Sequence, residues 1–268
     1  MTVEKIIIPI QSGTVEVVKF GRGKEALVIL PGLSYDGFLN QAEAIASAYR
    51  AFADDFTVYL IDRNKTPRAD YTVRKIADDT AEAMEKLKIE TADVFGASLG
   101  GMVAQELALH YPQVLKKLVL GSTLSRPNAT FLRVLSRWEA LAAAGKIDKM
   151  TADFYQTVYS PQTIRQYADA FSQIQTVATP EKTERFLIYL NAAKKFDLSL
   201  SLGQIQAKTL VIAATGDKVT TAAGAKETAE ALGCAYYEYP TFGHAVYDEA
   251  PDYKTRLLDF LIGGTQRE

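Results

Sequence analysis

Two β-rich runs open the chain, at residues 4–10 and 14–20, and the segment Gln-Ser-Gly separates them. Two such runs joined by turn-forming residues are typical of a hairpin. We therefore predict an antiparallel hairpin at the start of the fold.

The pattern then changes to short runs of consecutive apolar residues, which are typical of strands buried on both faces of a sheet. Helical segments lie between these runs, and in the clearest of them a set of residues in steps of three and four falls on one face: Val73, Ile76, Ala77, Thr80, Met84 and Leu87. Alternating strands and helices imply right-handed crossovers. The pattern predicts an α/β fold with a mostly parallel sheet flanked by helices, whose strands include residues 26–30, 57–61, 92–96, 115–121 and 209–214.

One region breaks the alternation. Residues 122–203 contain no strand-like run, and their helical stretches carry many aromatic residues. We predict a helical insertion there, between two strands of a single core formed by residues 1–121 and 204–268. Most aromatic side chains of such a small lobe supply buried area. We expect a few to face a substrate pocket instead, with Trp138, Phe154 and Tyr155 as candidates.

The overall composition narrows the function classes. The chain has 268 residues, of which 48% are hydrophobic, and a net charge of -2. The absence of a positive net charge argues against a nucleic-acid partner. The single cysteine, Cys234, allows no intrachain disulfide and no cysteine-rich metal site.

Residues 1–18 lack the pattern of a secretion signal, and no apolar run approaches the roughly 20 residues of a membrane span. We therefore expect a cytoplasmic protein.

The segment Gly96-Ala97-Ser98-Leu99-Gly100 is the candidate for chemistry. A serine hydroxyl is a poor nucleophile unless a base takes its proton and something stabilises the oxyanion. In G-x-S-x-G the serine occupies a strained strand-to-helix turn, and the glycines remove side chains that would collide there. A strand-like run precedes Ser98 and a helical run follows it, so we predict that Ser98 is the nucleophile.

The sequence has only two histidines. His110 ends the helix that Ser98 begins, roughly 18 Å away at 1.5 Å per residue, which leaves His244 as the base. The acid that orients the imidazole is expected at a strand end between the two. Asp217 follows the run 209–214, whereas residues 122–127 contain no carboxylate. Asp248 and Glu249 fit better as the start of the last helix.

The oxyanion requires two backbone N–H donors. We assign them to Leu99, directly after the nucleophile, and to Leu33 in the loop Pro-Gly-Leu-Ser-Tyr-Asp-Gly that follows the run 26–30. Ser34 and Tyr35 of the same loop are candidates for the pocket entrance.

These segments together resemble the α/β-hydrolase superfamily, in particular single-domain serine hydrolases with a helical cap. The resemblance spans nearly the whole chain. It includes "LPGLS" at the oxyanion loop, "GASLGG" at the elbow, "IQAKTLVIAATGDKVT" at the acid strand and "FGHAVYDEAPDY" at the histidine loop. Carried over by position, it implies the triad Ser98, Asp217 and His244 with Leu33 and Leu99 as oxyanion donors.

Two departures from the family pattern stand out. Pro31 replaces the histidine that usually precedes Gly32 and supports the loop. The segment "IDRNKTPRADYT" resembles the family's D-x-R-G-x-G-x-S but lacks its glycines, so we interpret Asp62 and Arg63 as structural. The serine also separates this chain from haloalkane dehalogenases and epoxide hydrolases, which the resemblance implies would carry aspartate at position 98.

The resemblance implies a hydrolase that acts through an acyl-enzyme, with no cofactor and no metal. The aromatic residues of the insertion and the absence of a basic cluster favour a small to medium, largely apolar carboxylic ester as the substrate. We expect a small-molecule substrate, no membrane span, and a monomer or homodimer. Thioesters and C–C bonds could be cut by the same residues, and a non-hydrolytic ligand receptor or signalling protein of this fold is a further alternative, because fold does not decide function.

Overall fold

The computed structural model describes residues 1–174 and 176–263. Eight strands form one sheet in the order β1-β2-β4-β3-β5-β6-β7-β8. Their bounds are Val3–Ile10 (β1), Gly13–Gly21 (β2), Glu25–Leu30 (β3), Phe56–Ile61 (β4), Ala92–Ala97 (β5), Leu115–Gly121 (β6), Lys208–Ala214 (β7) and Ala235–Tyr239 (β8).

The N-terminal hairpin is confirmed. β1 pairs with β2 in antiparallel register from Val3 opposite Phe20 to Ile10 opposite Gly13. β2 also pairs antiparallel with β4, while β4, β3, β5, β6, β7 and β8 pair parallel. The sheet is therefore mostly parallel, and its parallel strands all end at the same edge.

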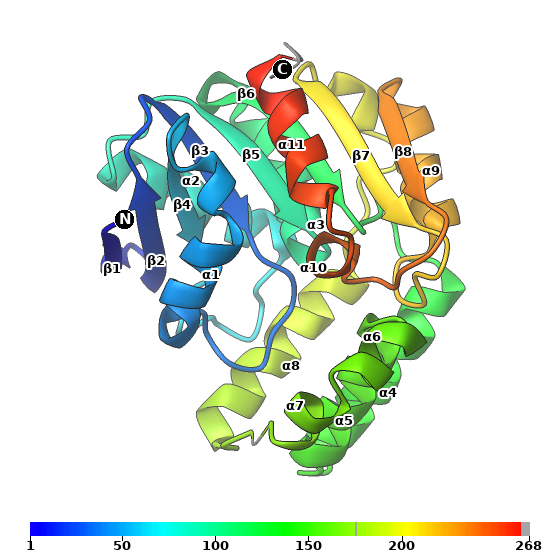
Figure 1. Cartoon of the computed structure of the whole chain (residues 1–268). Coiled ribbons are helices and arrows are strands. Elements are labelled where there is room, and N and C mark those ends of the chain that lie inside the picture. Colours follow the sequence, from blue (N-terminus) through cyan, green and yellow to red (C-terminus); the bar gives the residue numbers. More distant parts are fainter. Residues whose placement is uncertain (175, 264–268) are drawn as a thin grey trace.

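The central strands are buried on both faces, as their apolar runs predicted. Every residue of β5 is buried, and so is every residue of β7 after Lys208. Helices α2 (Val73–Lys86), α3 (Leu99–His110) and α9 (Ala222–Leu232) pack against one face. Helices α1 (Ala42–Ala48) and α11 (Tyr253–Ile262) pack against the other face (Figure 1).

Helix α2 shows why these segments become helices. Thr72 caps its first turn by accepting a hydrogen bond from the Lys75 N–H, which satisfies a donor that has no partner within the helix. The predicted face is buried from Val73 to Met84. Short 3-10 turns at Leu39–Gln41, Arg50–Phe52, Pro112–Val114 and Leu202–Gln204 complete the connections.

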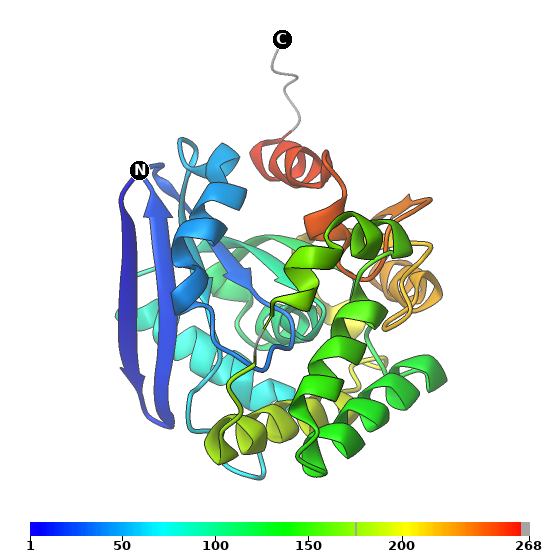
Figure 2. The ribbon, with the colours of Figure 1, turned by 60° about the horizontal axis from the view of Figure 1, so that its bottom comes forward.

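Among the described residues, five α-helices lie between β6 and β7 in the sequence: α4 (Ala129–Ala143), α5 (Ile147–Val158), α6 (Pro161–Gln166), α7 (Ala168–Ser172) and α8 (Pro180–Lys194). We call them the inserted helices. They lie together beyond the carboxyl ends of the parallel strands (Figures 1 and 2). Segments that follow β3, β5 and β7 therefore face the inserted helices across the same edge of the sheet.

Within residues 1–174 and 176–263, none of the helices has the length and apolar character needed to cross a membrane.

Candidate active site

Ser98 occupies the sharp turn between β5 and α3. Its backbone has φ 54° and ψ -120°, a conformation that costs energy for a residue with a side chain. The neighbouring glycines make the turn possible: a Cβ on Gly96 would lie 2.4 Å from the Gly100 carbonyl oxygen, and one on Gly100 would lie 1.9 Å from the Leu30 carbonyl oxygen. Both contacts are far too short, so the motif is required by close packing of backbones.

The structure brings Ser98, His244 and Asp217 together. His244 Nε2 lies 2.9 Å from Ser98 Oγ, and His244 Nδ1 lies 3.0 Å from Asp217 Oδ2. His244 is 3% exposed and Asp217 5% exposed. The hydroxyl therefore faces a base that is itself held by a buried carboxylate, which is the arrangement required to deprotonate a serine.

Asp217 is held by four hydrogen-bond donors. The Val219 and Thr220 N–H groups donate to Oδ1 at 2.7 and 3.0 Å, and the Thr220 hydroxyl donates to Oδ2 at 2.6 Å beside the imidazole. Burial alone would raise the pKa of Asp217, but the imidazole and these hydrogen bonds hold it below its usual value. Asp217 thus remains an acceptor for the His244 ring.

The loop after β3 lies directly against Ser98, since a Cβ on Gly32 would come within 3.3 Å of the Ser98 Cβ. Among residues 1–174 and 176–263, neither the Leu33 nor the Leu99 N–H donates a loop or cap hydrogen bond to another residue. Both predicted oxyanion donors are therefore without a protein acceptor beside the nucleophile.

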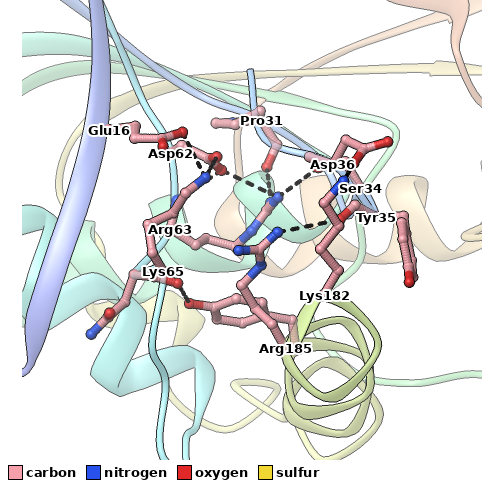
Figure 3. A network of polar contacts seen from close by, with 12 residues as sticks. Glu16, Pro31, Ser34, Tyr35, Asp36, Asp62, Arg63, Lys65, Lys182 and Arg185 are labelled. Atoms are coloured by element: carbon pink, nitrogen blue, oxygen red, sulfur yellow. Dashed lines mark hydrogen bonds and ion pairs between the residues drawn. The ribbon is translucent and has the colours of Figure 1, made fainter. Parts of the chain in front are cut away.

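Arg63, which we interpreted as structural from the sequence, supports this loop directly. Its guanidinium donates to the carbonyls of Pro31 (3.0 Å) and Gly32 (2.6 Å) and to Ser34 Oγ (3.0 Å). Figure 3 shows the guanidinium facing the loop. Because a peptide group is planar and trans, the Gly32 carbonyl and the Leu33 N–H point in opposite directions. A carbonyl held by Arg63 therefore fixes the direction of the Leu33 N–H.

Charged partners hold this network in place. Asp62 pairs with Arg63 and with Lys65, and Lys65 also contacts Glu16 on β2 (Figure 3). Helix α8 adds two contacts: Lys182 Nζ lies 2.7 Å from Asp36 Oδ1, and Arg185 donates to the Tyr35 carbonyl at 3.4 Å. The loop that carries Leu33 is thus supported from the sheet and from the inserted helices.

We expect Arg63→Met to lower kcat by roughly tenfold to a hundredfold with little change in KM, because a small misplacement of catalytic groups has effects of this size. Arg63→Lys is expected to recover only part of the rate, since an ammonium cannot bridge three acceptors as a guanidinium does. The measurement is steady-state kinetics on a p-nitrophenyl ester, together with the inhibition constant of a trifluoromethyl ketone that forms a tetrahedral adduct.

Lys65→Met is the matched control, because it removes charge pairs of Asp62 and Glu16 but no hydrogen bond to the Pro31 and Gly32 carbonyls that Arg63 holds. It should lower thermal stability and leave kcat near that of the wild type. Equal kcat values for Arg63→Met and Lys65→Met would show that Arg63 has only a structural role.

A cavity of about 360 Å³ adjoins Ser98 and His244. Its wall is mainly apolar, and the predicted pocket residues Ser34, Trp138, Phe154 and Tyr155 line it. Trp138 packs against Phe154 with ring centroids 4.8 Å apart, so α4 and α5 supply one side of the wall.

Tyr35, the remaining pocket candidate, does not line this cavity. Its ring packs against Phe186, with the centroids 5.8 Å apart, and its hydroxyl lies 2.8 Å from Thr183 Oγ1 on α8. The side chain points from the loop toward the inserted helices rather than toward the substrate space, because α8 offers it both an aromatic contact and a hydrogen-bond partner.

The two acids after His244 lie elsewhere than expected. Asp248 and Glu249 belong to a separate short helix, α10 (Val246–Glu249), and α11 begins only at Tyr253. Glu249 accepts hydrogen bonds from the Gly243 N–H (2.6 Å) and the Ser160 N–H (2.8 Å), and so ties the histidine loop to the start of α6. The sequence assignment of both acids to the last helix was wrong, because the turn at Pro251 separates the two helices.

The other histidine is far from this chemistry. His110 lies at the carboxyl end of α3, where its Nε2 is 3.2 Å from Glu106 Oε2. Among residues 1–174 and 176–263, there is no group of three or more His, Cys, Asp or Glu side chains arranged to share a metal ion.

Comparison with known proteins gives the family. A family model described as "alpha/beta hydrolase fold" matches residues 25–251. The "Putative carbamate hydrolase RutD" of Pseudomonas savastanoi pv. phaseolicola is 30% identical over 228 residues, covering 80% of this chain and 87% of that protein. The "3-oxoadipate enol-lactonase 2" of Acinetobacter baylyi is 24% identical over 216 residues, covering 73% of this chain and 79% of that protein.

The fold agrees with these matches. The crystal structure of the enol-lactonase from Burkholderia xenovorans LB400 has a TM-score of 0.84 to this structure at 19% identity, covering 96% of this chain and all of that one (100%). The family match runs through the elbow at Ser98, the acid strand and the histidine loop. The chain therefore belongs to the alpha/beta-hydrolase family.

Proposed function

We propose that this α/β-hydrolase is a serine hydrolase that cleaves a small to medium, largely apolar carboxylic ester. One observation carries the proposal: the Ser98 hydroxyl lies 2.9 Å from His244 Nε2 at the wall of a mainly apolar cavity. Among the described residues, no lysine or arginine side chain lines that cavity, which disfavours a phosphorylated or polyanionic substrate.

The proposed reaction is a two-step acyl transfer. His244 takes the Ser98 proton as Oγ attacks the carbonyl carbon, and the Leu33 and Leu99 N–H groups stabilise the oxyanion. Protonated His244 gives the proton to the oxygen of the leaving alcohol as the bond from that oxygen to the carbonyl carbon breaks, so the alcohol departs and the acyl-enzyme remains. His244 then deprotonates a water that attacks the acyl-enzyme, and the acid leaves as Ser98 regains its proton. Asp217 holds the His244 tautomer throughout.

We also propose that residues 122–203 act as a cap over a core formed by residues 1–121 and 204–268. The inserted helices support this division, because α4 and α5 line the cavity opposite the strand ends. Residues 175 and 264–268 lie outside the described residues.

A second candidate is carbamate hydrolysis, because a relative that is 30% identical bears the name of a carbamate hydrolase. The same nucleophile, base and oxyanion donors would act on a carbamate carbonyl. An enol-lactone, named for the Acinetobacter relative, is a cyclic ester and falls under the first proposal.

The test compares p-nitrophenyl esters from acetate to decanoate with p-nitrophenyl N-methylcarbamate. We expect kcat/KM to rise with acyl length and then to fall once the chain outgrows a cavity of about 360 Å³. A carbamate turned over faster than every ester would favour the second candidate. If the protein neither hydrolyses these compounds nor reacts with a fluorophosphonate probe, the enzymatic proposal fails and a ligand receptor becomes the better hypothesis.

A further inference from the structure

The cavity beside Ser98 contains a polar end that the proposed mechanism does not use. Tyr49 from the end of α1, Tyr159 from the end of α5, and Tyr247 and Asp248 from α10 all line it. We call these four side chains the polar end. Within the part of the chain that the structure describes, Asp248 is the only acidic side chain that lines the cavity, and no lysine or arginine lines it.

These groups have few partners within the protein. The Tyr159 hydroxyl lies 3.5 Å from Asp248 Oδ2, at the outer limit of a hydrogen bond. Among the hydrogen bonds of residues 1–174 and 176–263, none involves the hydroxyl of Tyr49 or Tyr247. Tyr49 is buried and Tyr159 and Tyr247 are half-buried, whereas Asp248 is exposed although it lines the cavity. Hydroxyls withdrawn from bulk water are normally paired, so the unpaired tyrosines indicate space for a polar ligand within reach of the Asp248 carboxylate.

The nearest cation does not fill this role. Lys254 Nζ donates to the Tyr247 backbone carbonyl at 2.8 Å and lies 5.2 Å from the centre of the Tyr49 ring. Lys254 does not line the cavity. Its ammonium thus lies behind the tyrosines and leaves the cavity side of Asp248 open.

The protonation states define what such a ligand must offer. Burial raises the pKa of Tyr49, Tyr159 and Tyr247, so their hydroxyls remain protonated donors. The polar end therefore combines hydroxyl donors with a carboxyl group that lacks a strong partner.

We propose that the polar end is a substrate subsite that binds a neutral group carrying both an N–H donor and a carbonyl acceptor, such as a primary carboxamide. The amide N–H groups would meet Asp248 and the amide oxygen would meet the tyrosine hydroxyls. A carboxylate would be repelled by Asp248, and an alkyl group would leave these polar groups unpaired. This inference rests on the proposed hydrolase function and adds a specificity determinant to it.

The position of the subsite limits where the amide stands in the substrate. Asp248 follows His244 by four residues, and α10 begins two residues after His244. Four residues of chain span at most about 14 Å even when fully extended. The carboxamide is therefore expected a few bonds away from the scissile carbonyl, at the end of a short chain.

The test uses matched ester pairs that differ only in a terminal carboxamide or an isosteric branched alkyl group. The group is placed on the acyl chain in one series and on the alcohol in the other. For the wild type we expect kcat/KM to favour the carboxamide by about tenfold or more in at least one series, and to disfavour a terminal carboxylate. The ratio within a pair is an internal control, since a general loss of activity cancels.

Asp248→Leu should abolish this preference, and Asp248→Asn should keep part of it because the amide retains an acceptor oxygen. Asp252→Leu is the matched control: Asp252 is an exposed residue that pairs with Arg256, and its loss should leave the preference unchanged. A wild type that hydrolyses the alkyl esters as well as the carboxamides, in both series, would overturn the subsite while leaving the hydrolase proposal intact.

A separate binding measurement covers the case in which no ester is hydrolysed and the hydrolase proposal fails. Calorimetric titration with hexanamide and with hexanoate then tests the polar end alone. Tighter binding of hexanamide to the wild type than to Asp248→Leu supports the subsite. Equal binding to both proteins, or tighter binding of hexanoate, rejects it.

Discussion

Ser98→Ala is expected to lower kcat on p-nitrophenyl esters by a factor on the order of 10⁵ to 10⁶, because the variant lacks the oxygen that forms the acyl-enzyme. The cavity and the N–H groups of Leu33 and Leu99 remain, so a small residual rate above that of water is expected. Turnover is measured with active-site titration, and reaction with a fluorophosphonate is followed by mass spectrometry. The variant should not be labelled.

Ser122→Ala is the matched control for this experiment. Ser122 also follows a parallel strand with a positive φ, 46°, and its buried hydroxyl has no hydrogen-bond partner among residues 1–174 and 176–263. Removing that hydroxyl should leave kcat unchanged and stability equal or slightly higher. If Ser98→Ala retains the rate of Ser122→Ala, the nucleophile is a different residue.

Asp217→Asn is expected to lower kcat by about 10⁴, through a change in the His244 tautomer. The Val219 and Thr220 N–H groups both donate to Oδ1, so the oxygen of the new amide must stay at that position. The amide nitrogen is then directed toward His244 Nδ1. A donor at Nδ1 favours the tautomer that carries its proton on Nε2, and that nitrogen could no longer accept the proton of Ser98.

Thr220→Val separates this effect from a general loss of support. It removes the hydroxyl that donates to Asp217 Oδ2 at 2.6 Å but keeps the carboxylate, so we expect a loss of about tenfold or less. The measurements are kcat and the downfield imidazole N–H proton resonance, which should be present in Thr220→Val and shifted or absent in Asp217→Asn. A kcat for Asp217→Asn within tenfold of the wild type would contradict the assignment of Asp217.

Much of the fold could be predicted because it follows from local pattern. The apolar runs of β3 to β7 correspond to strands buried on both faces, and the elbow is recognisable because each glycine meets a neighbouring backbone. The choice of His244 needed only a count of histidines and the length of α3. Such signals depend on residues close together in the sequence.

The supports of the site could not be predicted in this way. Arg63 contacts Pro31 and Gly32 from about thirty residues away in the sequence, and an arginine in a loop has no local pattern that reveals its acceptors. Tyr35 was expected at the pocket, but its side chain packs against α8 instead. The polar end could not be predicted either, because its four side chains come from three helices.

The α/β class, the family, and the candidate serine, acid and histidine could all be predicted from the amino-acid sequence, because periodicity and turn composition act locally. The folded structure was needed to find that Ser98 Oγ and His244 Nε2 lie 2.9 Å apart, that Arg63 holds the loop of Leu33, and that Asp248 lines the cavity. Those distances depend on how strands and helices pack after the chain has folded, and packing joins residues that no short stretch of sequence contains.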